Sequence, residues 1–497
     1  MSFSREITIY PKVATNKKHV GITAFAGVNV TGNEEYAPIG EMRHGYNVTV
    51  GENYVRGSFG VGQARVNGNL FTQPAQKGRL ILDAFFYQRY DYATKTRKDR
   101  LVYFLDNKDV YGTDFFGDLV YGSLGFHLSS EQASFVNFNM TGKDCLVAYD
   151  DNGMCYLFDG EKMQSSSEAP KLTSVCYHDR RVFGTVTDDC NKIAYSVKYN
   201  PIKWTEADGA GRITLPDEGG VVRRLVSFNG YLYVFRDYAV YKLTSYNNMR
   251  SYSIVKVFSG MNKVYAETVA CSHSKMYFLT DCGFYEYDGS KFSRIWQQYF
   301  PLLADKTYAN AIVDGDKYYL ACGIEKNGET VGEEGYCQKN NGILVVNLYC
   351  NEFTLFRGAD VKRFVPVNYE NKRYVYLVNN SPPRTGALGM ITDDGKMYRA
   401  SLKKLWKSPF TVLGGDEKEK IVRKVRLLSS SAVTLKVKVD EKEKTFVLTT
   451  NDKKKRNDVD LCGTKVGITV ETQNDTFLVD GFEIDYETSE RRNYGRN

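Results

Sequence analysis

The sequence predicts a mainly β protein: an irregular β-propeller of six or seven blades, an extended N-terminal arm and a C-terminal β-sandwich-like domain. Two patterns lead to this prediction. A phrase in which polar turn residues precede a short Tyr/Phe-rich run recurs along the chain, and Asp-Gly or Asn-Gly dipeptides separate strand-like runs. The composition agrees, because 37 Tyr and 28 Phe stand against only 11 Pro. Aromatic residues suit pleated, half-buried strands.

The recurring aromatic phrase sets the spacing of the repeat. One residue of each copy serves as an equivalent point: Tyr103, Val147, Phe183, Tyr233, Tyr277, Tyr319 and Tyr376. The steps between these points run from 36 residues (Val147 to Phe183) to 57 residues (Tyr319 to Tyr376). They lie close to the roughly 40 to 50 residues of a four-stranded propeller blade. The repeat alone does not decide between six and seven blades.

Tight-turn dipeptides connect the predicted strands. Such dipeptides tolerate the positive φ of hairpin turns, so they predict antiparallel meanders rather than βαβ units. They stand at Asn152-Gly153, Asn229-Gly230, Asp288-Gly289, Asp314-Gly315 and Asp394-Gly395. A helix-like stretch over 293–303 is interpreted either as a helix or as a connection between blades that ends at Pro301.

Changes in composition divide the chain into four predicted parts. Residues 1–95 are rich in Gly, Asn and Val without a steady period, which predicts an N-terminal arm and assembly segment. The repeats over 96–404 form the propeller. The alternating strands over 405–487 predict a C-terminal β domain with one face toward a core. The charged residues 488–497 are expected to form a mobile tail.

The overall composition excludes several classes of protein. No apolar run approaches the roughly 18 residues of a membrane span, and the N-terminus lacks the apolar segment of a secretory signal. A net charge of +7 over 497 residues, with acids and bases interleaved, does not predict tight nucleic-acid binding. The ten cysteines show no Cys-x-x-Cys spacing, so we expect reduced, mostly buried thiols.

A search for chemistry predicts no catalytic, cofactor-binding or metal-binding residue, and hence no enzyme. The five histidines form no ligand pair, and His178 and His273 fall in predicted turns. The segment 57–62 superficially resembles a phosphate loop, but its glycine spacing is wrong and no helix pattern follows. Asp150 with Glu161 suggests the ends of a calcium loop, but Cys155 occupies the position that requires glycine. A hairpin turn explains these residues better.

Marks of two common propeller families are missing. No Trp-Asp dipeptide ends the repeats, and the pairs Gly219-Gly220 and Gly414-Gly415 do not recur in each of them. The order of phrases instead resembles the propeller-bearing tail proteins of tailed bacteriophages, of the tail tubular protein B or nozzle type. The resemblance extends over about 20–490 and is carried by these segments: Phe25-Ala-Gly-Val-Asn-Val, Ile39-Gly-Glu-Met-Arg-His-Gly-Tyr-Asn-Val, Val175-Cys-Tyr-His-Asp-Arg-Arg-Val-Phe, Leu225-Val-Ser-Phe-Asn-Gly-Tyr-Leu-Tyr-Val-Phe and Met276-Tyr-Phe-Leu-Thr-Asp-Cys-Gly-Phe-Tyr-Glu-Tyr-Asp-Gly.

The resemblance implies a structural virion protein and transfers no catalytic residue. Copies of the chain would form a ring, sixfold in that family, around the tail channel through which DNA passes during ejection. Its implied partners are further copies of itself, the portal and adaptor, other tail proteins and tail fibres. The implied location is the virion tail, assembled in the host bacterial cytoplasm. On this view, a chain lacking residues 1–60 should remain a folded monomer that no longer forms rings.

Two alternatives remain open at this point. A carbohydrate-binding or carbohydrate-cleaving propeller used in receptor recognition would depend on rim aromatics such as Tyr231 and Tyr285. A cellular scaffold propeller would be a stable monomer without ring assembly.

Overall fold

The computed structural model describes residues 15–71, 79–115, 121–215, 219–245, 252–260, 262–324, 339–350, 352–369, 371–380, 388–415, 417–452 and 455–489. Strands dominate these residues, and the helical segments are short 3-10 turns, so the expected mainly β class is confirmed. The chain divides into two compact units by its internal contacts. Unit 1 consists of residues 1–58, 350–355 and 400–497, and unit 2 of residues 59–349 and 356–399. In the described residues, no helix has the length and hydropathy needed to cross a membrane.

Unit 2 is a propeller-like arrangement of small antiparallel sheets. Five of them have four strands each, in the order of the sequence. Their strands are β10 (Ile81–Tyr87), β13 (Arg100–Leu105), β14 (Asp109–Asp114) and β15 (Tyr121–His127); β16 (Ala133–Asn139), β17 (Asp144–Asp150), β18 (Cys155–Phe158) and β19 (Met163–Ser166); β20 (Leu172–His178), β21 (Arg181–Val186), β22 (Lys192–Tyr195) and β23 (Gly211–Thr214); β24 (Val222–Phe228), β25 (Tyr231–Arg236), β26 (Ala239–Ser245) and β27 (Tyr252–Ser259); β28 (Val264–Cys271), β29 (Met276–Thr280), β30 (Gly283–Tyr287) and β31 (Phe292–Ile295).

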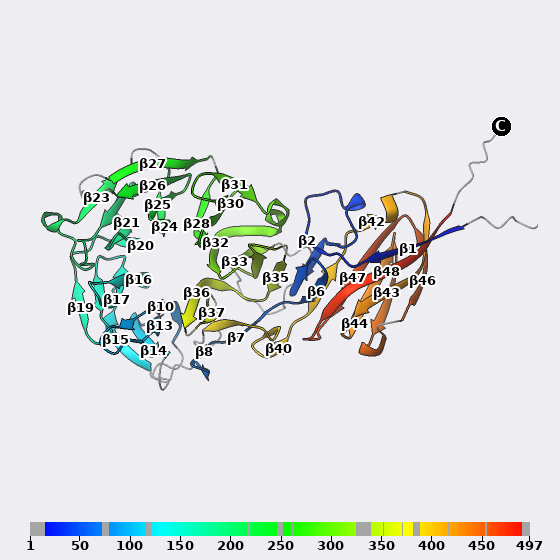
Figure 1. Ribbon diagram of the computed structural model, residues 1–497, viewed down its shortest axis with the longest axis horizontal. Coiled ribbons are helices and arrows are strands. Elements are labelled where there is room, and N and C mark those ends of the chain that lie inside the picture. The colour runs from blue at the N-terminus through cyan, green and yellow to red at the C-terminus, as the bar shows by residue number, and fades with distance from the viewer. Residues whose placement is uncertain are drawn as a thin grey trace, which may run out of the picture. The chain divides into compact units, whose positions relative to one another are not determined.

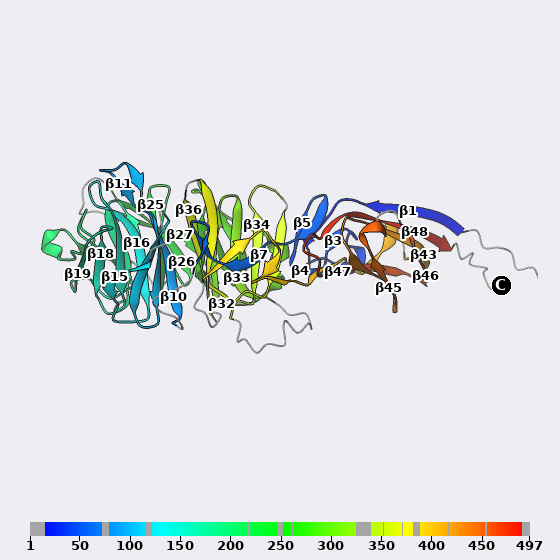
Figure 2. The same ribbon diagram turned by 90° about the horizontal axis from the view of Figure 1, so that it is seen from below.

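Two further sheets complete unit 2. One contains β32 (Leu303–Asp314), β33 (Lys317–Ile324) and β34 (Gly342–Asn347). The other contains β36 (Val361–Tyr369), β37 (Lys372–Asn379), β38 (Gly389–Thr392) and, from the N-terminal part of the chain, β7 (Gly60–Gln63). Figure 2 shows β7 in blue among the yellow strands of this sheet. The short strand β39 (Lys396–Met397) pairs with β7 in parallel.

The first strands of these sheets are neighbours in a closed order. Contacts join β10 to β16, β16 to β20, β20 to β24, β24 to β28, β28 to β32 and β32 to β36, and β36 returns to β10. Figure 1 shows the sheets of unit 2 following one another around a ring, from blue β10 through green β26 to yellow β36. A closed ring leaves few exposed sheet edges, which is one way in which β proteins avoid uncontrolled edge pairing.

The aromatic phrase marks the second strand of each sheet. The equivalent points Tyr103, Val147, Phe183, Tyr233, Tyr277, Tyr319 and Tyr376 lie in β13, β17, β21, β25, β29, β33 and β37. In six of the seven sheets the polar residues before the point belong to the short hairpin that joins the first strand to the second, whereas β10 and β13 are joined by the longer segment 88–99. At one such hairpin, Asn229 and Gly230 have φ of 47° and 78°, the two positive values that a type I′ turn requires. The predicted antiparallel meanders are therefore confirmed.

The apolar core of unit 2 lies between successive sheets. One buried cluster joins Tyr87, Val102 and Phe104 of the β10 sheet to Phe135 and Leu146 of the β16 sheet. Similar clusters join the β16 and β20 sheets, the β20 and β24 sheets, the β24 and β28 sheets, and the β36 and β10 sheets. The strand aromatics thus supply core packing, in keeping with the large apolar area that each of them buries.

The helix-like stretch over 293–303 is a connection between two sheets. After β31, a 3-10 helix covers Gln297–Leu302, includes Pro301 and leads into β32. Its N-cap, Trp296, has φ of 49° and stacks on Tyr277 at 5.5 Å between ring centroids. Proline removes one backbone donor and restricts the residue before it, which explains why a longer helix does not form.

Unit 1 combines both ends of the chain in two sheets. In the first, residues 353–355 of β35 (Phe353–Arg357), β5 (Val48–Gly51), β6 (Tyr54–Gly57), β48 (Leu478–Ser489), β43 (Lys420–Ser429) and β46 (Asn457–Gly463) follow one another, and β1 (Thr15–Ile22) also pairs with β48. The second contains β4 (His44–Tyr46), β41 (Lys404–Lys407), β47 (Lys465–Thr472), β44 (Val433–Val439) and β45 (Lys442–Leu448), with β42 (Thr411–Val412) on β47. The two-residue period expected of the C-terminal strands is present in β44, whose residues alternate between buried and half-buried. A short parallel pair, β2 (Ala26–Val28) with β3 (Glu41–Met42), completes the unit's pairings.

These pairings divide the chain differently from the ranges predicted by composition. Residues 15–57 belong to the same unit as the C-terminal strands, β7 belongs to unit 2, and β10 begins its first four-stranded sheet. Val48, Val50 and Val55 are at most 1% exposed. A chain without residues 1–60 would lose these buried core strands, so the structure argues against the expectation that it stays folded. Of the predicted tail over 488–497, residues 488 and 489 belong to β48, and residues 490–497 lie outside the described residues.

Candidate functional site

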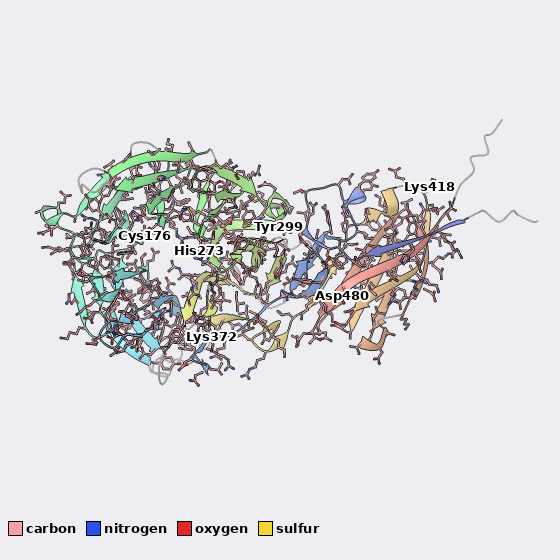
Figure 3. All side chains as sticks on the ribbon, in the orientation of Figure 1. Cys176, His273, Tyr299, Lys372, Lys418 and Asp480 are labelled. Carbon is pink, nitrogen blue, oxygen red and sulfur yellow. The ribbon has the colours of Figure 1, made fainter. Side chains whose placement is uncertain are left out.

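A central cavity of about 1070 Å³ in unit 2 is the candidate functional site. The first strands of all seven sheets contribute to its wall, and Lys339 and Asn380 add to it. Figure 3 draws the side chains of the ring as sticks. The volume is at the upper end of the range of small-molecule pockets, about 300–1,000 Å³.

β-bulges near the start of the first strands direct polar side chains toward this cavity. In β10, β20, β24 and β36, a buried aliphatic residue is followed by one extra residue before pairing with the second strand resumes. A bulge bends its strand and re-aims side chains, so two successive residues can face the same side. Cavity-lining residues that follow from these bulges are Asp83, Thr173, Ser174, Arg223, Arg224, Lys362 and Arg363.

Polar bridges close every junction between neighbouring sheets. Most are donated by a side chain to a backbone carbonyl on the next sheet, and each such bond contributes about 0.5–1.5 kcal/mol to stability. In order around the ring they are Asn137 Nδ2 to Phe86 O (3.1 Å), Ser134 Oγ to Thr173 O (3.0 Å), His178 Nδ1 with Ser227 Oγ (2.9 Å), Arg224 Nη1 to Ala266 O (3.1 Å), Tyr318 Oη to Thr268 O (3.0 Å), Asn310 Nδ2 to Val361 O (3.2 Å) and Lys362 Nζ to Leu82 O (2.7 Å). Many of the polar side chains at the cavity therefore form hydrogen bonds that connect neighbouring sheets of the ring.

Cations outnumber anions on the cavity wall. The nine charged residues are Arg223, Arg224, Lys263, Lys339, Lys362 and Arg363 against Asp83, Asp237 and Glu267. Each carboxylate has an arginine beside it: Arg363 Nη1 donates to Asp83 at 2.5 Å, Arg223 binds Asp237 in a bidentate pair at 2.8 and 3.3 Å, and Arg224 lies 3.6 Å from Glu267. The lysines have no such partner, since among the described residues no carboxylate oxygen lies within 4.0 Å of Lys263, Lys339 or Lys362.

Burial and neighbouring charges shift the titration of these groups. Burial raises the pKa of Asp83, and the adjacent Arg363 guanidinium partly offsets this effect. Burial would also raise the pKa of Asp237, but hydrogen bonds from Arg223 and from the Val221 amide outweigh it and lower the pKa. The pKa of the Lys362 ammonium is lowered by burial and further by the positive charges of Arg363 and Lys339.

The calcium-loop segment considered from the sequence is a hairpin. Asp150 ends β17, is fully buried, and accepts hydrogen bonds from the amides of Ser129, Asn152 and Met154 at 2.9–3.1 Å. These donors occupy the carboxylate oxygens that a cation would need. The hairpin interpretation is therefore confirmed. Across the described residues, no cluster of three His, Cys, Asp or Glu could hold a metal ion.

The segment 57–62 forms strand structure rather than a phosphate loop. Gly57 ends β6, and Gly60 begins β7, which pairs with β38. Between them, the Phe59 ring stacks on Phe356 at 4.9 Å. A Cβ atom on Gly60 would lie 2.5 Å from the carbonyl oxygen of Lys396, so close backbone packing explains this glycine.

The other residues considered from the sequence, a histidine, two tyrosines and the cysteines, can be placed in the structure. His178 is 6% exposed and contacts Ser227, and burial lowers its pKa. Of the proposed rim aromatics, Tyr231 has the Lys242 ammonium 3.5 Å from its ring centroid, and Tyr285 stacks on Phe278 at 5.6 Å. The nine described cysteines are free thiols; Cys145, Cys155 and Cys322 are buried, whereas Cys190 and Cys350 are exposed.

The sequence search missed the cavity residues, although a signal for them exists. At the start of four first strands, an aliphatic residue precedes two residues of which the second, and in three strands also the first, lines the cavity: Ile81-Leu-Asp, Leu172-Thr-Ser, Val222-Arg-Arg and Val361-Lys-Arg. Each of these triplets lies a short way upstream of an aromatic phrase. Aligning the repeats over the first strand as well as the second would have found them.

Comparisons with known proteins give only distant likenesses. No family model matches the sequence, and no curated protein matches it. Among solved structures, the Raptor protein of Chaetomium thermophilum shares 10% identity at a TM-score of 0.42, covering 67% of this chain and 28% of that chain. YCF48 bound to D1 peptide shares 10% identity at a TM-score of 0.38, covering 65% of this chain and 94% of that chain. The chain thus spans less than a third of the Raptor chain.

Proposed function

We propose that this chain is a structural subunit of a bacteriophage tail, a nozzle or tail-tube component that assembles into a ring around the DNA channel. In this proposal the seven sheets of unit 2 are the blades of one closed propeller, and unit 1 is a β-sandwich-like assembly domain. The resemblance of the sequence phrases to phage tail proteins motivates the proposal. The location that goes with it is the virion tail.

The observation that carries the proposal is the open edge strand β1 of unit 1. In the described residues β1 pairs only with β48, and its residues Asn16 to His19 are exposed. Lys17 and Lys18 give this strand a positive charge. An exposed edge strand is a ready contact for another chain, and lysines on it disfavour unselective pairing.

The other end of the same sheet exposes carboxylates. Strand β46 is its last strand and carries Asp458 and Asp460, whose side chains are 69% and 54% exposed. Within the chain they pair with Lys424 at 3.2 Å and Arg423 at 3.3 Å. Lysines exposed at one edge and aspartates exposed at the other are compatible with a head-to-tail contact between copies, which closes into a ring when the rotation permits.

Unit 2 suits a part that bears load in such an assembly. Its seven junctions are each bridged by hydrogen bonds, and its sheets are packed through shared apolar clusters. The lining carboxylates are engaged by arginines, so they do not form a free pair of the kind that glycoside hydrolysis uses. The proposal therefore assigns this protein no catalysis.

Native mass spectrometry of the purified chain tests the proposal. We expect a discrete ring whose mass is a multiple of the 56.5 kDa chain, six copies by the family resemblance. The variant Lys17→Glu/Lys18→Glu should dissociate it. The matched control Lys162→Glu/Lys171→Glu reverses two exposed charges of unit 2 and should leave the ring intact. A wild-type chain that stays monomeric, or a ring that survives the β1 reversal, would contradict the proposal.

A further inference from the structure

One corner of the central cavity concentrates positive charge. Lys362 and Arg363 are brought to the cavity by the bulge in β36, and Lys339 lies on the wall beside them. The one carboxylate in contact with this group is Asp83, which binds Arg363. Among these groups in contact, three cations and one carboxylate leave an excess of two positive charges.

Most donors of the two lysines are unused. Lys362 Nζ donates to Leu82 O at 2.7 Å, which leaves two of its three N–H groups. Lys339 Nζ lies 4.4 Å from the centroid of the Tyr308 ring and has no hydrogen-bond acceptor in the described part of the chain. Both lysines are exposed to the cavity, and an ammonium group with unused donors gains charge-assisted hydrogen bonds when it contacts an oxyanion.

The electrostatics agree with this geometry. The positive charges of Arg363 and Lys339 each lower the pKa of Lys362, so both lie close enough to repel its ammonium group. Glu131 acts on Lys362 in the opposite direction, and Glu267 acts on Asp83 and Arg363, but Glu267 is itself beside Arg224. The excess of positive charge therefore persists.

We propose that the central cavity binds a small phosphate monoester, with the phosphate between Lys339, Lys362 and Arg363. A doubly charged oxyanion matches the charge excess, and arginine and lysine are the usual ligands of such groups. The Tyr308 ring is 50% exposed on the cavity wall beside Lys339. It offers an apolar face to the organic part of the ligand. The cavity of about 1070 Å³ holds such a molecule with room for water.

Calorimetric titration of the full chain at low ionic strength tests the proposal. Inorganic phosphate and glucose 6-phosphate are the probes, and citrate serves as the carboxylate comparison. We expect both phosphates to bind, the ester more tightly, and citrate to bind at least tenfold more weakly. Lys339→Met and Lys362→Met should each weaken phosphate binding at least tenfold.

Lys263→Met is the matched control, because Lys263 lies on the same cavity wall but next to Asp237. Its affinity for phosphate should stay within twofold of the wild type. Lys362→Met loses the hydrogen bond to the Leu82 carbonyl, so circular dichroism and the melting temperature will show whether this variant remains folded. Lys339→Met loses no hydrogen bond within the described residues and therefore tests the site independently. No binding of either phosphate, tighter binding of citrate, binding of duplex DNA alone, or equal losses in all three variants would overturn the proposal. The two proposals can fail separately. A ring that binds no phosphate contradicts only the phosphate site, and a monomer that binds phosphate contradicts only the proposed tail function.

Discussion

Replacing Phe25 by alanine tests whether the N-terminal segment is an integral part of unit 1. Phe25 is 5% exposed, and its ring lies 5.7 Å from Trp406 in an edge-to-face contact and 6.3 Å from Phe482. Truncating a buried Phe costs about 3–5 kcal/mol through lost burial and the cavity left behind. The edge-to-face contact with Trp406 accounts for about 0.5–1.5 kcal/mol of this. A free energy of 3 kcal/mol is a factor above one hundred in the opening equilibrium.

Hydrogen exchange resolved by peptide is the appropriate assay, because it reports on unit 1 without requiring the whole chain to unfold in two states. We expect amides of β43 and β48 to exchange about a hundredfold faster in Phe25→Ala. The control Val447→Ala lies in the same unit, at a side chain that is 76% exposed, and should change stability by less than about 0.5 kcal/mol. If Phe25→Ala changes exchange as little as the control does, residues 15–57 are a peripheral arm and the structural argument is wrong.

Two further predictions concern unit 2. In Gly60→Ala, the new Cβ would lie 2.3 Å from Asp394 Oδ1 and 2.6 Å from the Lys396 amide nitrogen, so chemical denaturation should show a free energy of unfolding lower by about 1–3 kcal/mol. The control Gly122→Ala changes a strand glycine with nothing within 4 Å of the added atom, and it should lower the free energy of unfolding by less than about 1 kcal/mol. Equal effects of the two substitutions would refute the packing of β7. Burial lowers the pKa of His178 below its ordinary 6.5, so the unfolded chain binds this proton more readily and the free energy of unfolding should fall as the pH drops below 6.5. Denaturation between pH 7 and pH 5 should show a shallower fall for His178→Gln, and identical slopes would exclude His178 as a contributor.

The repeat could be predicted from the sequence because most sheets contain the same local structure, a hairpin followed by an aromatic second strand. A polar hairpin followed by a Tyr/Phe-rich second strand satisfies turn geometry and core packing together, so the pattern survives in short windows such as Phe228 to Phe235. The turn at Asn229-Gly230 was predictable for the same reason, since few residues tolerate its backbone angles.

The division into units was not readable, because strand pairing joins residues that are distant in the sequence. Val50 pairs with Phe353, Val55 pairs with Val479, and Gly62 pairs with Met390. Nothing in the composition of residues 1–95 specifies these partners, so the Gly- and Asn-rich texture was interpreted as an arm.

The cavity was missed for a related reason. Most of the charged residues that line it stand in the less regular first strands, and a bulge at Lys362 or Arg223 breaks the two-residue alternation on which strand patterns depend. The charge excess at Lys339, Lys362 and Arg363 exists only after two separate segments are brought together.

We propose that this propeller-bearing chain assembles through unit 1 into a ring around a channel. A cryo-electron-microscopy reconstruction of the purified, assembled chain is the decisive measurement. We expect a closed ring, sixfold by the family resemblance, with an open axial channel and β1 of each copy in contact with a neighbouring copy. Isolated single chains, or a ring in which β1 faces solvent in every copy, would contradict it.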